Sequence, residues 1–139
     1  MEFSHNAFIA IDLDASVDFY IKYCGMQIDR EEQALAGGEA LRVVYLKLKA
    51  DGNQYFALIE RKESVAGYGD THDTVGEKEI GIHHFGFDVG SKDELLAIHK
   101  RIKEENSDTN EIEEVSEAHE RFIVRDPDGR RVEYNWRAK

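Results

Sequence analysis

The sequence predicts an α+β fold made of two copies of one module, each with a strand, a helix and further strands in that order. Three observations support this prediction. Strand-like runs occur in both halves of the chain, each half has one helix-like segment with its own N-terminal signal, and the order of segments repeats with a period near half of the 139 residues. Each module is too small to bury its own sheet face, so we expect the two to stabilise each other by packing.

The first module, residues 1–63, begins with an expected strand over Ser4–Ile11. Asp12 and Asp14 then introduce a helix that Gly25 ends. Apolar residues recur every three or four positions along this helix, namely Leu13, Val17, Tyr20, Ile21 and Cys24. Three more strands and a hairpin turn complete the module, with the strands at Met26–Arg30, Leu41–Lys49 and Tyr55–Glu60 and the turn at Ala50–Asn53.

A polar segment punctuated by glycines, Arg61–Glu79, follows the last expected strand of the first module. We expect its residues 64–79 to form a linker or a mobile flap between the modules. The second module, residues 80–139, then repeats the order of the first and begins with an expected strand over Ile80–Val89.

A capping box formed by Ser91 and Glu94 introduces the helix of the second module. The segment Glu104–Glu120 contains eight acids and few apolar residues, so its pattern predicts no definite structure. Three segments close the module, namely a strand at Arg121–Arg125, a turn at Asp126–Gly129 and a strand at Arg131–Trp136.

Composition and charge exclude several classes of function. Eighteen Lys and Arg against 29 Asp and Glu give a net charge of −11, which repels nucleic acids and anionic membranes. No apolar run is long enough to span a membrane, and the N-terminal residues lack the pattern of a secretory signal. The single cysteine, Cys24, fits a reducing compartment. We therefore expect a cytoplasmic protein whose partner is a small molecule, and neither a nucleic acid nor a membrane.

The repeat also places polar residues at matching positions in the two modules. His5 begins the first strand of one module, and His84 lies in the first strand of the other. Glu60 lies late in the last strand of the first module, and Glu133 lies in the last strand of the second. Two imidazoles and two carboxylates on strands can surround a divalent metal and leave positions open for water or substrate.

Strand alternation places the second pair on one side of its sheet. Successive side chains of a strand face opposite sides, so Phe85 and Phe87 would pack against the helix while His84 faces the other, concave side. The same alternation places Glu133 on that concave side. The residues expected there are His84, Gly86, Asp88, Glu133 and Asn135.

Each candidate ligand also has a simpler interpretation. These alternatives are a surface position for His5, an exposed strand end for Glu60 beside Arg61, and a surface ion pair of Glu133 with Arg131 or Arg137. His83 is an alternative to His84 as a ligand. Three further histidines, His72, His99 and His119, are expected to be solvated.

Short segments distributed over nearly the whole chain match the motifs of a known family. They are His5 with Asp12-Leu13, Asp18-Phe19-Tyr20 with Cys24-Gly25-Met26, Ala57–Glu60, Gly81–Val89 and Asp126–Glu133. In these segments the chain resembles the vicinal oxygen chelate superfamily, the group of glyoxalase I, methylmalonyl-CoA epimerase, extradiol dioxygenases and bleomycin resistance proteins. The resemblance implies paired βαβββ modules that form a curved, incomplete barrel around a metal.

Within that superfamily the chain is most similar to glyoxalase I. The resemblance implies a divalent metal bound by His5, Glu60, His84 and Glu133, with nickel or zinc expected first and cobalt, iron or manganese as alternatives. In glyoxalase I the metal binds neighbouring oxygens of a hemithioacetal and stabilises an enediolate, while a carboxylate moves the proton. That carboxylate would be Glu133, with Glu60 as the alternative base. Small members of the family dimerise, so a homodimer is implied as well.

Two departures from the family pattern bear on the substrate. Glutathione-binding members carry Arg in the first strand where this chain has Ile9, and Asn shortly after the second ligand where it has Arg61–Ser64. We therefore expect a metal-dependent lyase or isomerase whose small substrate, with vicinal oxygens, need not be linked to glutathione. The alternative enzyme is a carboxyacyl-CoA epimerase of the methylmalonyl-CoA type. The alternative of another class is a metal-free small-molecule-binding or resistance protein.

Overall fold

The chain divides into two compact units, Met1–Gly69 and Asp70–Lys139. The computed structural model describes residues 4–36, 39–48, 52, 54–61, 84–105 and 108–139. The expected linker, residues 64–79, lies outside the described residues, and so does most of the expected hairpin turn at Ala50–Asn53. Among the described helices, neither is long and apolar enough to cross a membrane.

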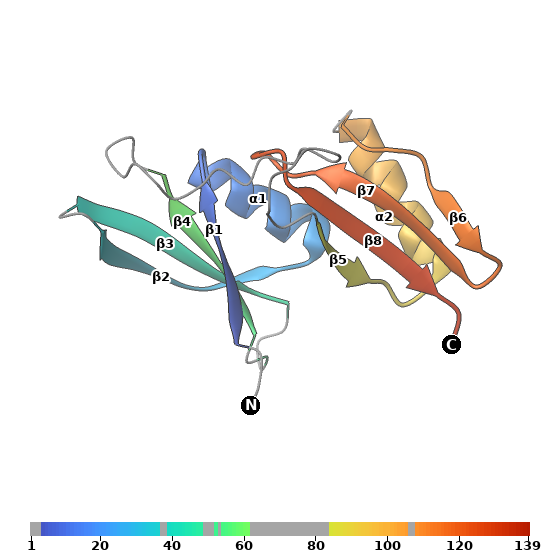
Figure 1. The fold of residues 1–139 in the computed structure, drawn as a ribbon, viewed down its shortest axis with the longest axis horizontal. Coiled ribbons are helices and arrows are strands. Elements are labelled where there is room, and N and C mark those ends of the chain that lie inside the picture. The colour runs from blue at the N-terminus through green and yellow to red at the C-terminus, as the bar shows by residue number, and fades with distance from the viewer. Residues whose placement is uncertain (1–3, 37–38, 49–51, 53, 62–83, 106–107) are drawn as a thin grey trace, which may run out of the picture. The chain divides into compact units, whose positions relative to one another are not determined.

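In its described residues, the first unit contains one helix and a four-stranded sheet (Figure 1). Its elements are β1 (His5–Ala10), α1 (Leu13–Cys24), β2 (Gln27–Ala36), β3 (Glu39–Lys47) and β4 (Tyr55–Glu60). The strand order is β1-β4-β3-β2, with β1 parallel to β4 and the other neighbours antiparallel.

The second unit repeats this topology. Its elements are β5 (Phe85–Asp88), α2 (Lys92–Glu105), β6 (Glu113–Ser116), β7 (His119–Arg125) and β8 (Arg131–Arg137). The strand order is β5-β8-β7-β6, again with the first and last strands parallel and the others antiparallel. The predicted α+β fold with two βαβββ modules is therefore confirmed.

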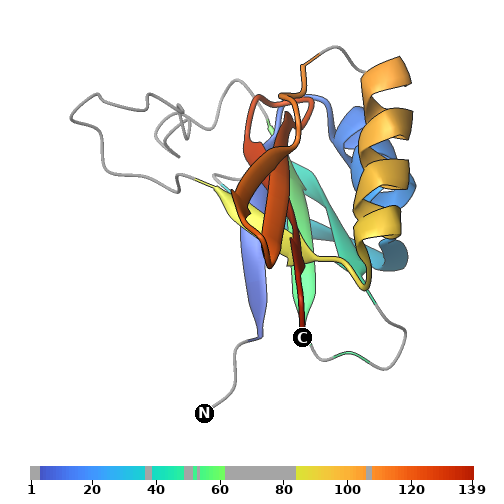
Figure 2. The same ribbon diagram turned by 90° about the vertical axis from the view of Figure 1, so that its right-hand side faces the viewer.

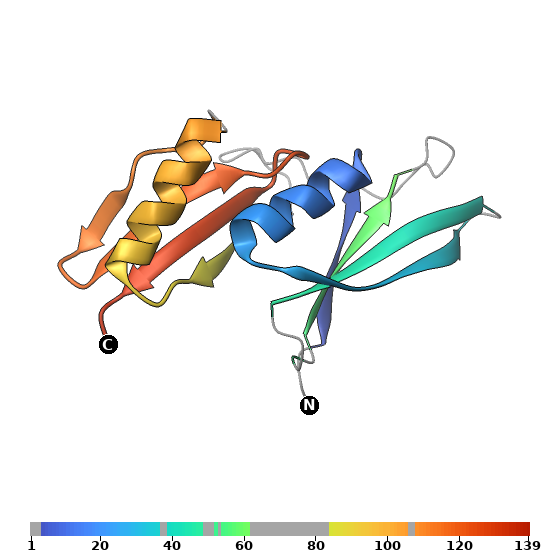
Figure 3. The ribbon, with the colours of Figure 1, turned by 180° about the vertical axis from the view of Figure 1, so that it is seen from behind.

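In each unit the helix covers one face of the sheet, as the views in Figures 2 and 3 show for α2. Tyr20 of α1 packs edge-on against Phe56 of β4, with ring centroids 5.9 Å apart. In the second unit Phe122 and Tyr134 stack at 4.8 Å on the side of α2, beneath the fully buried Leu95 and Ile102. The opposite face of the second sheet is left for polar residues.

The ends of the helices follow the predicted signals. Asp12 caps α1 by accepting a hydrogen bond from the Ala15 N–H at 3.0 Å, and Gly25 ends this helix with a left-handed φ of 64°. Ser91 caps α2 through the Glu94 N–H at 3.1 Å. Both helix starts are therefore confirmed.

Three details differ from the sequence-based expectations. Ile21, expected on the apolar face of α1, is 38% exposed. The strand expected to end at Arg30 continues to Ala36, because β2 pairs with β3 along its whole length. The acidic segment that predicted no definite structure contains β6, an edge strand paired with β7.

Candidate functional site

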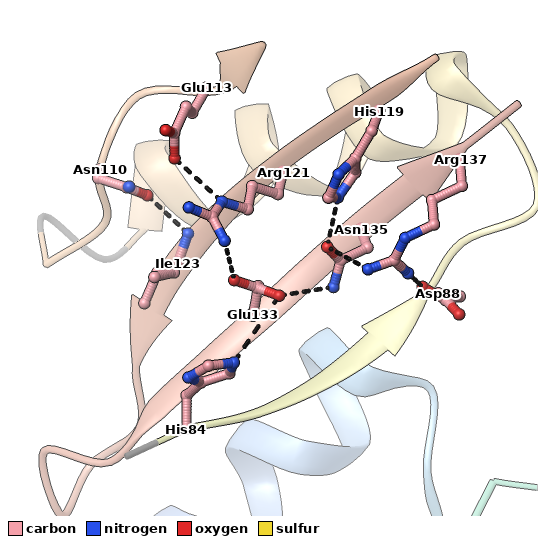
Figure 4. A network of polar contacts seen from close by, with 10 residues as sticks. All are labelled: His84, Asp88, Asn110, Glu113, His119, Arg121, Ile123, Glu133, Asn135 and Arg137. Atoms are coloured by element: carbon pink, nitrogen blue, oxygen red, sulfur yellow. Dashed lines mark hydrogen bonds and ion pairs between the residues drawn. The ribbon is translucent and has the colours of Figure 1, made fainter. Parts of the chain in front are cut away.

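A polar network covers the face of the second sheet that lies opposite α2 (Figure 4). Gly86 of β5 lies beside Glu133 of β8 in the register, so Glu133 shares a face with position 86 and with His84, two residues earlier, whose Nε2 lies 4.0 Å from Glu133 Oε1. The residues that alternate with Glu133, Val132 and Tyr134, are buried on the helix side. The predicted placement of His84 and Glu133 on one side of the sheet, opposite the helix, is therefore confirmed.

Glu133 is the centre of this network. Its side chain is only 8% exposed, and it accepts hydrogen bonds from Asn135 Nδ2 at 2.9 Å and from Arg121 Nη1 at 3.2 Å. His84 Nε2 lies 4.0 Å from Glu133 Oε1, and the imidazole is 39% exposed. Burial of a carboxylate is costly unless donors or cations meet it, and here both do.

Arg121 links Glu133 to the edge of the sheet. Its Nε donates to Glu113 Oε2 on β6 at 3.0 Å, while its Nη1 donates to Glu133. The hydrogen bond to Glu113, together with the negative charges of both glutamates, raises the pKa of Arg121 above its ordinary value. The guanidinium is therefore a permanent positive charge beside the buried carboxylate.

Asn135 orients the other side of Glu133. Its Oδ1 lies 2.9 Å from His119 Nε2 and 3.4 Å from a guanidinium nitrogen of Arg137, which itself pairs with Asp88. Because Oδ1 serves these two donors, the amide nitrogen of Asn135 is turned toward Glu133. The orientation of the buried carboxylate is therefore fixed from both sides.

Gly86, which has no side chain, leaves space for the Asn135 amide beside Glu133. A Cβ atom at Gly86 would lie 3.1 Å from the Glu133 carbonyl oxygen and 3.2 Å from Asn135 Nδ2. Both distances are shorter than ordinary van der Waals contact, so any larger residue would press on the Asn135 amide.

In the first unit, the structure places His5 and Glu60 far apart. His5 is exposed, with Nδ1 2.8 Å from Ser4 Oγ, and it lies beside Tyr55 in the β1–β4 register. Glu60 lies beside Ala10 at the other end of the same register, and its Oε2 accepts a hydrogen bond from the Arg42 N–H at 3.2 Å. The two positions are five residues apart along the strands, which corresponds to about 16 Å.

The two predicted pairs fit a metal to different degrees. His84 and Glu133 lie on one face with Nε2 and Oε1 4.0 Å apart, a separation that suits two ligands of one ion. His5 and Glu60 do not converge within their unit. Among the described residues, no group of three His, Cys, Asp or Glu side chains is arranged to hold a metal ion. The set of four ligands stays a prediction.

Three residues of the second unit, Arg121, His119 and His99, make contacts that differ from the expectations. Glu133 pairs with Arg121, whereas its simpler interpretation, a surface ion pair, named Arg131 or Arg137. His119 and His99 were expected to be solvated, but His119 contacts the buried Asn135, and His99 is 9% exposed with Nε2 2.9 Å from the Asn110 carbonyl oxygen. Alternation along β7 would have placed His119 and Arg121 on one face. His72 and His83 lie outside the described residues.

Comparisons with known proteins agree with this fold. The family model of the glyoxalase/bleomycin resistance protein/dioxygenase superfamily matches residues 2–134. The chain therefore belongs to this superfamily. A comparison with curated protein sequences gives no significant match.

Solved structures with the same fold cover nearly all of the chain. A glyoxalase family protein from Bacillus cereus aligns with a TM-score of 0.78 and 12% identity, over 100% of this chain and 95% of that one. The fosfomycin resistance protein FosX from Listeria monocytogenes aligns with a TM-score of 0.70 and 14% identity, over 98% and 93%. A lactoylglutathione lyase from Agrobacterium tumefaciens aligns with a TM-score of 0.62 and 23% identity, over 97% and 92%. At these identities the likeness shows the fold alone.

Proposed function

We propose that this chain is a metal-dependent lyase or isomerase that moves a proton on a small substrate with vicinal oxygens. The observation that supports the proposal best is the position of Glu133, a buried carboxylate held on the open face of the second sheet with the His84 imidazole 4.0 Å away. A carboxylate in that position can accept a proton from a carbon next to a carbonyl group and return it to a neighbouring carbon.

The residues of the network have separate tasks in this proposal. Glu133 is the base, Asn135 holds its carboxylate in one orientation, and Arg121 balances its charge. A divalent metal, with nickel or zinc as first choices, is proposed for the ligand set that the resemblance implies, namely His5, Glu60, His84 and Glu133. When bound, such a metal supplies Lewis-acid stabilisation of negative charge on the substrate oxygens.

The proposal also concerns the class of substrate, which need not be linked to glutathione. Ile9, where glutathione-binding relatives carry Arg, lies on the same face of its sheet as His5 and is only half-buried. An apolar side chain there offers no charge to a glutathione carboxylate, which supports a substrate without that group. The lactoylglutathione lyase from Agrobacterium tumefaciens, which has the same fold, supports the reaction class.

Proton exchange tests the role of Glu133. We expect the wild-type protein to exchange the substrate C–H for deuterium in D₂O and the Glu133→Gln variant to lose this exchange while keeping its circular dichroism spectrum. Methylglyoxal with glutathione and methylmalonyl-CoA, assayed side by side, distinguish the glyoxalase reaction from the epimerase alternative. Undiminished exchange in the variant removes Glu133 as the base.

A metal-free binding or resistance protein is the second candidate, and one observation favours it. Arg121 and Asn135 already donate to both oxygens of Glu133, so the carboxylate is satisfied without a metal. The like-folded fosfomycin resistance protein shows that resistance functions occur on this fold. Metal analysis of the purified protein separates the candidates, because the binding protein would carry no stoichiometric Ni, Zn, Co, Fe or Mn and would not change on their addition.

We also propose a homodimer, on the resemblance to small members of the superfamily. Light scattering coupled to size-exclusion chromatography measures the molar mass directly. A mass close to twice the 15.9 kDa of one chain supports the proposal, and the mass of one chain contradicts it.

A further inference from the structure

We propose that Glu60 is neither a metal ligand nor a base, and that it stabilises the β3–β4 pair instead. The β1–β4 strand pair then contributes only one metal-binding side chain, His5. This inference deepens the proposed function, on which it rests for the presence of a metal, and it removes one of the four ligands that the resemblance implies.

The register of β1 and β4 provides the first argument. The pairs run without a bulge from His5 beside Tyr55 to Ala10 beside Glu60. Paired residues of parallel strands share a face, and faces alternate along each strand. Glu60 is five positions beyond Tyr55, an odd number, so its side chain faces the side of the sheet opposite to His5.

Aromatic contacts identify which face is which. Phe56 is four positions before Glu60 and therefore shares its face. Its ring packs on Tyr20 of α1 and on Phe8, with centroid distances of 5.9 Å and 5.5 Å. Leu58, between Phe56 and Glu60 on the same face, has no exposed surface. Glu60 therefore lies on the helix-covered side of its sheet.

The face that His5 occupies has no replacement for Glu60. The β4 residues on this face are Tyr55, Ala57 and Ile59. None of them carries a carboxylate or an imidazole, and Ala57 is 4% exposed. A metal that His5 binds would therefore find no carboxylate of β4 beside it.

Glu60 has a structural task where it lies. The paired residues of β3 and β4 end at Val43 and Ile59, so Arg42 is the first β3 residue beyond the ladder. The carboxylate of Glu60 accepts the Arg42 N–H at 3.2 Å and so satisfies a backbone donor that the ladder leaves. The side chain of the same residue, Arg42, forms ion pairs with Glu31 at 2.9 Å and with Asp14 at 3.2 Å.

Metal titration of matched variants tests the inference. Ni²⁺ and Zn²⁺ are titrated separately into wild type, Glu60→Gln, Glu133→Gln and the control Glu104→Gln, which removes one exposed carboxylate from α2. We expect Glu60→Gln to bind each ion as wild type and Glu104→Gln do, and Glu133→Gln to bind about tenfold more weakly or worse. Thermal melting of Glu60→Gln and Glu60→Ala follows in parallel, because Gln keeps an acceptor for the Arg42 N–H and Ala does not.

Each outcome decides a different point. If Glu60→Gln, natively folded, loses about tenfold or more in affinity, Glu60 is a ligand and the inference is overturned. If Glu60→Ala melts at the same temperature as Glu60→Gln, the structural task is overturned. If wild type binds neither ion, the metal in the proposed function is overturned, while a lower melting temperature of Glu60→Ala still supports the assignment of Glu60.

Discussion

The orientation of the buried Glu133 carboxylate is set by the hydrogen-bonding roles of its two donors, Arg121 and Asn135. Glutamate oxygens only accept hydrogen bonds, and a guanidinium only donates them, so Arg121 has a single way to meet Glu133. The Asn135 amide could face either way, but His119 and Arg137 both approach its oxygen. The orientation of one catalytic candidate thus depends on two residues that do not touch it.

Replacing Asn135 by Asp tests this arrangement. The variant places two carboxylates within hydrogen-bond distance, where Asn135 Nδ2 and Glu133 Oε1 are now 2.9 Å apart. We expect the free energy of unfolding at neutral pH to fall by about 2 kcal/mol. The loss should shrink as the pH falls, because the paired carboxylates then share a proton. Asn110→Asp is the matched control, since Asp keeps the oxygen that accepts the Ile123 N–H.

Replacing Gly86 by Ala tests whether the network needs the space that the missing Cβ atom leaves. In Gly86→Ala the new Cβ atom meets backbone and a buried amide, whereas in Gly90→Ala it meets only the flexible end of Glu94, at 3.1 Å. We expect Gly86→Ala to be less stable than Gly90→Ala by about 1 kcal/mol and to lose activity as Glu133 and Asn135 shift. Equal urea denaturation midpoints would show that the sheet accommodates the methyl group.

At the scale of elements, local signals predicted helices better than edge strands. Both helices have a capping side chain and regular apolar spacing, so their starts were predicted correctly. The far part of β2 and the whole of β6 have no such signal, because they are polar edge strands held by ladders to β3 and β7. Pairing with a distant partner, rather than local propensity, determines such strands.

An ion pair at the bulge of β2 predicts a pH dependence of stability. Asp29 lies where the β2–β3 register shifts, and its carboxylate contacts Lys47 at 2.7 Å and Arg30 at 3.0 Å. The hydrogen bond from Lys47, with help from Arg30, lowers the pKa of Asp29 below its ordinary value of 3.8. Its stabilisation is therefore complete above that pH and is lost as the pH falls through the lower, folded-state value.

The variant Asp29→Asn makes this dependence measurable. We expect wild type to melt at a higher temperature than the variant at neutral pH, and the difference to close as the pH falls below the ordinary pKa of 3.8. Asp18→Asn, an exposed position on α1, is the control for removal of one carboxylate. A difference between wild type and Asp29→Asn that persists in acid would mean that packing at the bulge, and not the charge, is responsible.

At the scale of the whole molecule, the repeat was the most informative feature of the sequence. It predicted the shared topology of the two units and brought His84 and Glu133 to one face. It also suggested that Glu60 corresponds to Glu133, but the two glutamates differ in register. Glu133 lies beside Gly86, the second residue of β5, on the open face, whereas Glu60 lies beside Ala10, the last residue of β1, on the helix face. The sequence spacing matched them to within a loop, but Glu60 pairs with a residue five positions after His5, and Glu133 pairs with a residue two positions after His84. Because five is odd and two is even, Glu60 faces away from its histidine and Glu133 faces the same side as its own.

The net charge of −11 predicts how the whole chain responds to salt. Repulsion among the excess carboxylates opposes the compact state, whereas single exposed ion pairs contribute little. Raising the ionic strength from about 0.01 M to about 0.1 M shortens the Debye length from about 30 Å to about 10 Å. We therefore expect the melting temperature at pH 7 to rise with salt, and to be insensitive or to fall at a pH near the isoelectric point of 4.9, where no net repulsion exists. A fall at pH 7 would show that the ion pairs along β2, β3 and β7 outweigh the repulsion.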